Sequence, residues 1–356
     1  MAEEMKAVAL TRHLPIDDPD ALQDLRLPRP QPGPRDLLVR VEAVSVNPVD
    51  AKLRAPKPGA PATLDPPRIL GFDAAGVVEA VGEEVELFQP GDEVYYAGDV
   101  TRPGCNAQYQ LVDERLAGPK PTTLDFAEAA ALPLTTITAW ELLFERMPFD
   151  FDAEENGRSL LVIAGAGGVG SIAIQLARHA GFKVIATASR PQTRQWCERM
   201  GAHHVVDHRQ PLAPQLQALG FDNVDAAINL ADTDRYWEPL GELLAPQGHV
   251  GLVVEPTGAL HIGDPYKAKC IGIHWEFMFA RPKFRTADMI CHHRILSRAG
   301  SLVEAGELRT TLTEVLGPIN AANLREAHRR MDAGTAIGKL ALAGWDCPPQ
   351  KRLTPL

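Results

Sequence analysis

The stretch Ser159-Leu-Leu-Val-Ile-Ala-Gly-Ala-Gly-Gly-Val-Gly170 determines how the rest of this sequence is interpreted. Its apolar run from Leu160 to Ala164 has the length and composition of a strand that is buried on both faces. Glycines follow in the spacing G-x-G-x-x-G from Gly165 to Gly170, and an amphipathic helix then runs to Gly181. The spacing alone also fits a tight turn in any α/β protein. A strand, a glycine turn and a helix N-terminus in this order predict a binding turn for the pyrophosphate of a dinucleotide.

The region from residue 159 to about 280 alternates between predicted strands and predicted helices. After the first strand, further strands are expected at 183–188, 205–206, 224–230, 249–254 and 270–278. Helices are expected between them at 192–200 and 234–244. This alternation predicts a doubly wound parallel sheet.

The first third of the chain is predicted to be rich in β-structure. Short strands are expected at 6–10, 36–46, 77–81 and 91–96, with Pro- and Gly-rich loops between them. This pattern predicts a small, barrel-like β domain. Asp125 and Glu128 have the spacing of a capping box, so a helical region is expected to begin there and to continue to Glu145. Helices at 287–305 and 323–331 and a strand at 338–342 complete the prediction.

Composition narrows the class of protein. The chain has 356 residues, a hydrophobic content of 45% and a net charge of −10, which fit a soluble protein and argue against a nucleic-acid-binding surface. No apolar run has the roughly 20 residues needed to cross a bilayer. The N-terminus lacks the apolar core of a secretion signal, so we expect a cytoplasmic protein. The five cysteines contain no C-x-x-C pair, which predicts free thiols.

Seven motifs together resemble the medium-chain dehydrogenase/reductase superfamily. They are similar to motifs of its zinc-free quinone oxidoreductases and of the zinc-type alcohol dehydrogenase-like proteins. The motifs lie at 46–50, 71–76, 91–94, 132–140, 164–170, 274–279 and 338–340. The resemblance covers essentially the whole chain and implies an α/β fold with two domains. A GroES-like β-rich catalytic domain (1–130 and 306–356) would flank a Rossmann domain with a doubly wound parallel sheet (131–305), and relatives are commonly homodimers.

The sequence departs from the zinc-dependent members of this family. Asn47 stands where they have a cysteine ligand, and Phe72 stands where they have a histidine. The third ligand would fall in the region of 132–134, which contains no cysteine, and only Cys105 remains of a four-cysteine structural site. Because a catalytic zinc needs about three protein ligands, we expect no metal. The alternative is a zinc-dependent alcohol dehydrogenase with displaced ligands.

The second predicted strand of the α/β region indicates the cofactor. NAD is usually held by an acidic residue at this position, whereas here the strand ends in Ser189 and Arg190, with Arg194 close behind. Guanidinium groups suit a phosphate, so this site predicts NADPH. The alternative is a solvated helix start with surface arginines.

Further site residues are implied by the resemblance. The expected cofactor-binding residues are Asn47, Thr136, Gly165, Gly167, Gly168, Val169, Gly170, Ser189, Arg190, Arg194, His208, Asn229 and Lys339. The expected catalytic residues are Asn47, Lys52 and Thr136, and the expected substrate-binding residues are Lys52, Trp275, Phe277 and Phe279. Each has an ordinary structural alternative. Lys52 and Lys339 also fit solvent-exposed lysines, His208 fits a loop histidine, and the aromatic residues, placed on one face of a strand, fit core packing.

These expectations define one reaction class. A nicotinamide cofactor supplies hydride, and a conjugated carbonyl or quinone delocalises the resulting charge, so modest hydrogen-bond donors suffice without a metal. The sequence therefore predicts a zinc-independent, NADPH-dependent oxidoreductase that reduces quinones or α,β-unsaturated carbonyls. A non-catalytic NADPH-binding protein with a structural or regulatory role is the other alternative.

Overall fold

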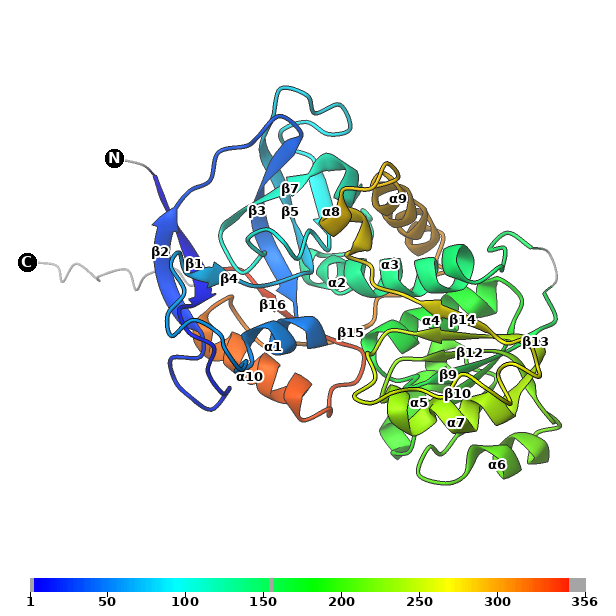
Figure 1. Cartoon of the computed structure of the whole chain (residues 1–356). Helices are drawn as coiled ribbons and strands as arrows, with labels where there is room; N and C mark the ends of the chain where they lie inside the picture. Colours follow the sequence, from blue (N-terminus) through cyan, green and yellow to red (C-terminus); the bar gives the residue numbers. More distant parts are fainter. Residues whose placement is uncertain (1–2, 154–155, 346–356) are drawn as a thin grey trace, which may run out of the picture. The chain divides into compact units, whose positions relative to one another are not determined.

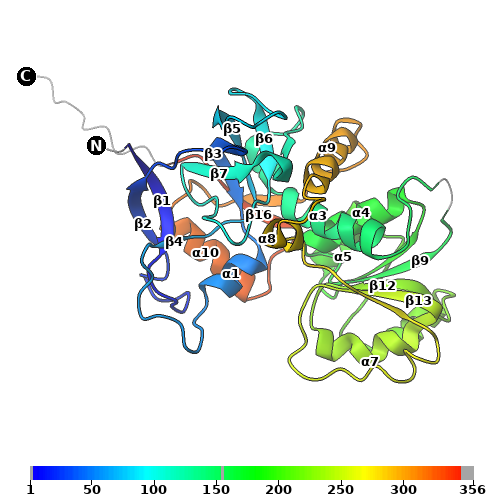
Figure 2. The same ribbon diagram turned by 45° about the horizontal axis from the view of Figure 1, so that its top comes forward.

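The computed structural model describes residues 3–153 and 156–345 of the chain. The chain divides into two compact units (Figures 1 and 2). Unit 1 comprises Met1–Pro133, Pro282–Leu296 and Leu312–Leu356, and unit 2 comprises Leu134–Arg281 and Ser297–Thr311. Unit 1 is therefore built from both ends of the chain. The domain boundaries predicted at residues 130 and 305 stay predictions.

Unit 2 is built on a six-stranded sheet in which all neighbouring strands are parallel. In spatial order, its strands are β11 (His204–Val206), β10 (Lys183–Thr187), β9 (Ser159–Ile163), β12 (Val224–Asn229), β13 (Leu244–Leu252) and β14 (Gly272–Trp275). The order runs outward from β9 in both directions, and sheets of this kind bind ligands at the carboxyl end of such a strand. The predicted doubly wound parallel sheet is confirmed.

The connections of unit 2 are mostly helical. They include α3 (Pro133–Glu141), the π-helical turn η2 (Leu142–Arg146), α4 (Gly168–His179), α5 (Pro191–Met200), α6 (Leu212–Ala218) and α7 (Thr233–Leu243). Figure 2 shows α4 and α7 on opposite faces of the sheet. The helices α8 (Ala280–Phe284) and α9 (Cys291–Glu304) contribute residues to both units. Helix α6 was not predicted, because it is short and contains Pro214 in its first turn, where a proline is tolerated.

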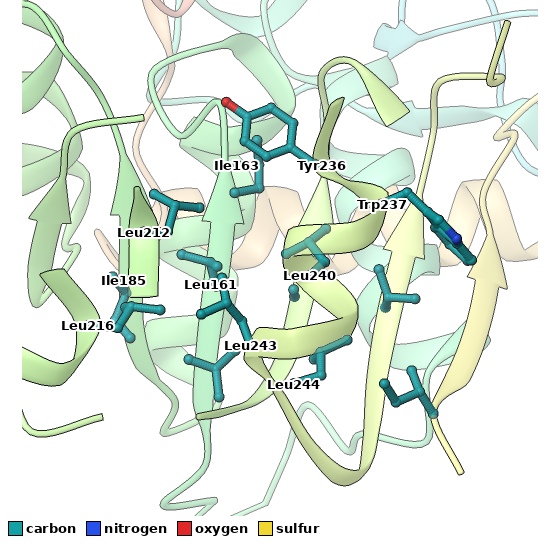
Figure 3. Packing of buried hydrophobic residues seen from close by; sticks show 14 of the residues in the cluster. Leu161, Ile163, Ile185, Leu212, Leu216, Tyr236, Trp237, Leu240, Leu243 and Leu244 are labelled. Atoms are coloured by element: carbon teal, nitrogen blue, oxygen red, sulfur yellow. The ribbon is translucent and has the colours of Figure 1, made fainter. Parts of the chain in front are cut away.

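One face of this sheet carries a large apolar core. Leu161 on β9 and Ile185 on β10 belong to the same buried cluster as Leu240 and Leu243 of α7 (Figure 3). Tyr236 and Trp237 at the start of α7 extend this cluster, and both are also buried. The packing fixes the sheet and its helices as one body and so holds the carboxyl ends of the strands in place.

Unit 1 contains two sheets whose strands are mainly antiparallel. The larger sheet has the order β15 (Leu312–Val315), β16 (Lys339–Ala343), β3 (Asp36–Ser45), β5 (Ala74–Val81), β6 (Glu93–Tyr96) and β8 (Ala117–Pro119), and β7 (Tyr109–Asp113) also pairs with β3. The smaller sheet has the order β2 (Gln23–Pro28), β1 (Glu4–Leu10) and β4 (Arg68–Ile69). Figure 1 shows the two sheets within this unit.

Short helices complete unit 1. They are α1 (Pro48–Arg54), the 3₁₀ turn η1 (Glu114–Leu116), α2 (Phe126–Ala130) and α10 (Ala321–Asp332). The predicted capping box of α2 is confirmed, because Asp125 accepts from the N–H of Glu128 at 2.8 Å and Glu128 accepts from the N–H of Asp125 at 3.1 Å. Helix α1 was not predicted, although Pro48 occupies the first helical position, which prolines favour. Over the described ranges, no helix is long and apolar enough to cross a membrane.

Candidate functional site

The glycine turn of unit 2 lies at the carboxyl end of β9, as predicted. Thr187, the last residue of β10, holds its start: the hydroxyl of Thr187 accepts from the N–H of Ala164 at 3.0 Å. Ala164 has a φ of 63°, a left-handed conformation that is uncommon for a residue with a side chain and that often marks functional turns. The first N–H groups of α4 lack partners within the helix, so this helix start can bind an anion.

The three glycines of this turn serve different purposes. A Cβ on Gly170 would lie 2.5 Å from the carbonyl oxygen of Ala164, and one on Gly165 would lie 2.7 Å from the Cβ of Ala186. These two glycines allow close packing of the turn, helix and strand. A Cβ on Gly167 would meet only the carbonyl oxygen of Ala164, at 3.4 Å. The packing of unit 2 therefore does not require glycine at 167, whereas a ligand that approaches the backbone would. Gly168 and Val169, which complete the predicted set, form the first turn of α4 and are half-buried.

The predicted phosphate-binding residues lie just beyond β10. Ser189 is half-buried, and Arg190 is exposed at the start of α5. Arg194 donates to the carbonyl oxygen of Val205 at 2.8 Å and to that of Ala188 at 3.4 Å, so it braces the ends of β10 and β11. Two of its five N–H donors are thus used within unit 2.

Sequence reasoning missed a further guanidinium group at this place. Arg209 follows β11, the strand next to β10, and donates to the carbonyl oxygen of Ser189 at 3.0 Å. It also forms an ion pair with Asp207, with a shortest N–O distance of 2.6 Å. The signal in the sequence was a basic residue after the third strand, but its position beside Ser189 depends on strand order, which local patterns do not reveal.

Two other predicted cofactor residues occupy different parts of the same edge of unit 2. His208 is half-buried, and burial is the largest cause that lowers the pKa of its imidazole. Asn229 is the last residue of β12 and is buried; its amide oxygen accepts from the N–H of Ala231 at 3.1 Å. Asn229 therefore shapes the turn after β12 at the carboxyl edge of the sheet.

Thr136 is the predicted nicotinamide contact in unit 2. It lies on α3 and is fully buried, and within the described residues its hydroxyl has no hydrogen-bond partner. A buried hydroxyl without a partner costs free energy, so a ligand that supplies this partner would be favoured.

The prediction of a strand from Cys270 to Met278 is wrong. Strand β14 runs only from Gly272 to Trp275, because Trp275 pairs with the last residue of β13 and Cys270 has a left-handed φ of 52°. Phe277 and Phe279 lie in the turn before α8 and therefore do not share a strand face with Trp275. Trp275 and Phe277 are each 47% exposed, whereas Phe279 is buried. Of these three aromatic side chains, only those of Trp275 and Phe277 are exposed enough to contact a ligand.

An ionic cluster surrounds Glu276, which lies within this aromatic segment, and its members Glu141, Glu276 and Arg281 are buried. Arg146 donates to Glu276 at 2.9 Å and to Glu141 at 2.8 Å, and Arg281 forms ion pairs with Glu141 and Glu145. Three carboxyl groups thus face two guanidinium groups. Burial, followed by the charge of Glu141, raises the pKa of Glu276. This excess of carboxyl groups is accommodated when Glu276 keeps its proton.

In unit 1, the predicted residues Asn47 and Lys339 meet in one buried network. The ammonium of Lys339 donates to Asn47 Oδ1 at 2.5 Å, to Asp73 Oδ2 at 2.8 Å and to the carbonyl oxygen of Val46 at 2.9 Å. The Asn47 amide donates to Asp73 Oδ2 at 2.8 Å and to the carbonyl oxygen of Phe72 at 3.4 Å. Lys339 is 2% exposed, so it is not the solvent-facing lysine that was the alternative from sequence.

Asp50 supports the same network from α1. Its carboxylate accepts from the N–H of Asn47 at 2.8 Å and from the N–H of Gly71 at 3.0 Å. Burial is the largest cause that raises the pKa of Asp50, to about 7. Lys52, two residues further along α1, is exposed, and no hydrogen bond to another described residue holds its ammonium group.

The donor atoms of this network do not fit a zinc site. Zinc is held by thiolate, imidazole or carboxylate groups, whereas the side chain of Asn47 is an amide already used by Lys339 and Asp73. Cys105 is nearby, but its thiol donates to the carbonyl oxygen of Asp73 at 3.2 Å, and burial raises the pKa of the thiol. Throughout residues 3–153 and 156–345, no three His, Cys, Asp or Glu side chains are grouped to hold a metal ion. Cys105, Cys197 and Cys270 are free thiols, and Cys347 lies outside the described residues.

Comparisons with known proteins agree with this architecture. Residues 33–124 match the family described as "Alcohol dehydrogenase GroES-like domain", and residues 168–268 match the family described as "Zinc-binding dehydrogenase". A "Zinc-type alcohol dehydrogenase-like protein" from Staphylococcus epidermidis is 39% identical over 95% of this chain and 99% of that relative. The "NADPH-dependent alkenal/one oxidoreductase, chloroplastic" of Arabidopsis thaliana is 32% identical over 86% of this chain and 71% of that relative.

The backbone of this chain is also similar to those of solved structures. The crystal structure of "a putative zinc-dependent alcohol dehydrogenase protein" from Rhizobium etli is 48% identical to this chain. The match covers 98% of this chain and 100% of that one, with a TM-score of 0.90. Given the GroES-like region, the parallel sheet with its glycine turn and these relatives, the chain belongs to the medium-chain dehydrogenase/reductase superfamily of oxidoreductases.

Proposed function

We propose that this protein is a metal-independent, NADPH-dependent oxidoreductase that reduces quinones or α,β-unsaturated carbonyl compounds. The observation that carries the proposal is the set of hydrogen bonds made by the side-chain amide of Asn47. This residue stands where zinc-dependent relatives have a ligand, and its amide is hydrogen-bonded to Lys339, to Asp73 and to the carbonyl oxygen of Phe72. A Lewis acid at this position is therefore replaced by a closed hydrogen-bond network.

The nucleotide-binding part of the proposal rests on unit 2. The N-terminus of α4 and the space at Gly167 suit a pyrophosphate, and the end of β10 presents Ser189 and Arg190 where NAD enzymes present a carboxylate. Arg209 adds a guanidinium group beside Ser189 to that of Arg190, whereas Arg194 braces the ends of β10 and β11. These groups favour a phosphorylated ribose, in agreement with the name of the Arabidopsis relative.

The proposed substrate class follows from the hydrogen-bond donors of the chain, which are weaker than a metal ion at polarising a carbonyl group. A bound nicotinamide would supply hydride, and the residues around it would only have to orient the substrate and stabilise a delocalised oxyanion. The hydroxyl of Thr136 and the exposed ammonium of Lys52 are the proposed donors, and Trp275 and Phe277 are the proposed contacts for a flat substrate. A conjugated carbonyl or a quinone needs no more than such donors.

The test is NADPH oxidation, followed at 340 nm, with three substrates of different electronic character. We expect turnover with 9,10-phenanthrenequinone and with a simple enone, and far slower turnover with a saturated ketone of similar size. Faster reduction of the saturated ketone would point instead to an alcohol dehydrogenase. Tight NADPH binding without turnover of any substrate would point to a non-catalytic role. Either outcome would overturn the proposal.

We also propose that the protein forms a homodimer. Strand β14 is the edge of the parallel sheet, and the apolar side chain of Ile273 on it is 38% exposed. An exposed apolar edge strand favours pairing with a second copy. Sedimentation velocity should show a dimer that dissociates in the Ile273→Lys variant, and a monomeric wild type would contradict the proposal.

A further inference from the structure

Three guanidinium groups from separate elements gather around His208 in unit 2. Arg235, in the first turn of α7, donates to the carbonyl oxygen of His208 at 2.9 Å. Arg209, the next residue after His208, donates to the carbonyl oxygen of Ser189 at 3.0 Å. Arg190, at the start of α5, is close enough for its charge to lower the pKa of His208. Local patterns in the sequence do not indicate that the segments after β10, β11 and β12 place arginines together.

The charge balance of this cluster is positive. Burial is the main cause that lowers the pKa of His208, and the charges of Arg235, Arg209 and Arg190 lower it further. Among the described groups that act on His208, Asp207 supplies the single negative charge. This local excess of positive charge is found on a chain whose net charge is −10, so it marks a place for an anionic ligand.

Asp207 is fully engaged by Arg209. The Nε of Arg209 lies 3.0 and 3.1 Å from the two carboxylate oxygens of Asp207, and its Nη2 lies 2.6 Å from one of them. The hydrogen bonds from Arg209 lower the pKa of Asp207 to about 2, so the carboxylate stays ionised. A carboxylate at this edge would otherwise be suited to accept the ribose hydroxyls of NADH. Arg209 therefore covers the one group in the cluster that would favour the unphosphorylated cofactor.

Arg209 also retains donors for a ligand. Its side chain is 62% exposed, and its Nη1 group makes no hydrogen bond within the described ranges. A phosphomonoester accepts hydrogen bonds from planar guanidinium groups in a bidentate manner. Arg194, in contrast, is held by the carbonyl oxygens of Ala188 and Val205, so it braces the strand ends and is not counted in the cluster.

We propose that Arg190, Arg209 and Arg235 form the anion-binding cluster that selects a ribose 2′-phosphate, and that the Asp207–Arg209 pair is its selector. This inference rests on the proposed use of NADPH. The pair acts in two ways: Arg209 binds the phosphate, and by covering Asp207 it removes an acceptor for the hydroxyls of NADH. Loss of Arg209 would both weaken NADPH binding and expose a carboxylate that repels phosphate and accepts ribose hydroxyls.

The experiment is calorimetric titration of the full chain with NADPH, NADH and adenosine 2′,5′-bisphosphate at constant ionic strength. For Arg209→Gln, we expect the Kd of NADPH and of the bisphosphate to rise about 10- to 100-fold, while the Kd of NADH stays equal or falls. Adding Asp207→Asn should restore part of the NADPH affinity, because the exposed carboxylate is then neutral. Arg199→Gln is the matched control, since Arg199 is an exposed arginine of α5 that stacks on Trp196.

The possible failures are distinguishable. A wild-type protein that prefers NADPH, together with an Arg209→Gln variant that keeps this preference, would overturn the selector and leave the proposed cofactor standing. A wild-type protein that binds NADH more tightly than NADPH would overturn both. Thermal unfolding of each variant checks that a change in affinity does not reflect a change in folding.

Discussion

The ammonium of Lys339 lies 2.8 Å from the carboxylate of Asp73, and both side chains are buried. The two residues are 266 positions apart in the chain, at the start of β16 and just before β5. A buried charge is tolerated only with a partner, so each of these residues makes the other possible. Their pairing also fixes Asn47, because both contact its amide.

Removal of one member of this pair should strongly destabilise the protein. For Lys339→Met we expect a loss of about 3 to 5 kcal/mol in the free energy of unfolding, because the buried carboxylate of Asp73 loses the ammonium group 2.8 Å away. Lys57→Met, which removes an exposed lysine of unit 1, should change it by less than about 0.5 kcal/mol. Urea denaturation measures both values. Equal stability of the two variants would show that Asp73 is not charged in the native state.

The glycine turn offers a contrast between packing and binding. Gly170→Ala should destabilise unit 2 by about 1 to 3 kcal/mol, because its Cβ would collide with backbone atoms of Ala164 and Gly165. Gly167→Ala should leave the melting temperature nearly unchanged but raise the Kd of NADPH about tenfold or more, because a Cβ there would approach the bound pyrophosphate. Thermal unfolding and calorimetric titration measure the two effects. Normal NADPH binding by Gly167→Ala would place the pyrophosphate elsewhere.

Local sequence patterns predicted those features that depend on neighbours in the chain. The glycine turn follows from residues 159–170, and the cap of α2 follows from Asp125 and Glu128, which are three positions apart. Strand alternation predicted the parallel sheet, because each βαβ unit is a local pattern. The end of β14 could not be predicted, because it depends on where its partner β13 ends.

The parts of the site that join distant segments were not accessible from sequence. Lys339 and Asn47 are 292 positions apart, and no periodicity relates them. Arg209 reaches the end of β10 because β11 lies beside that strand, and Arg235 reaches His208 from α7. Lys339 was named from the resemblance, but its burial and its three hydrogen bonds emerged only from the structure.

We expect the buried imidazole of His328 to lower the free energy of unfolding in acid. It is buried on α10, and neither ring nitrogen has a hydrogen-bond partner among the described residues. Burial, with a smaller effect of the Arg54 charge, lowers the pKa of His328 to about 3. The unfolded chain takes up a proton near pH 6.5, so this histidine should reduce stability by about 3 kcal/mol as the pH falls from 7 to 4.

Substitution isolates the contribution of His328. His328→Leu should flatten the decrease in the free energy of unfolding between pH 7 and 4, whereas His261→Gln, at an exposed position of unit 2, should keep it. Urea titrations at several pH values give the comparison. If His328→Leu shows the same acid dependence as the wild type, the imidazole of His328 takes up its proton equally in the folded and the unfolded state.

We expect the carboxyl group of Glu276 to give the free energy of unfolding the opposite dependence on pH. Its pKa is raised in the folded protein by burial and by Glu141, so the folded state keeps a proton that the unfolded chain releases above about pH 4.5. Stability should therefore fall as the pH rises from neutral towards 9, by at most about 1.4 kcal/mol per pH unit. Glu276→Gln keeps the hydrogen bond from Arg146 without the titration, so its melting temperature should fall less. Glu255→Gln, at an exposed position, serves as the control, and an identical pH dependence of Glu276→Gln and wild type would contradict this account.

The most direct measurement is the turnover of metal-free protein. The protein is dialysed against a strong chelator, its zinc content is determined by mass spectrometry, and NADPH oxidation with 9,10-phenanthrenequinone is followed at 340 nm. We predict that kcat is unchanged by dialysis and by added zinc, because among the described residues the amide of Asn47 and the ammonium of Lys339 leave no ligand set for a metal. Activity that is lost on dialysis and restored by zinc would contradict metal-independent hydride transfer.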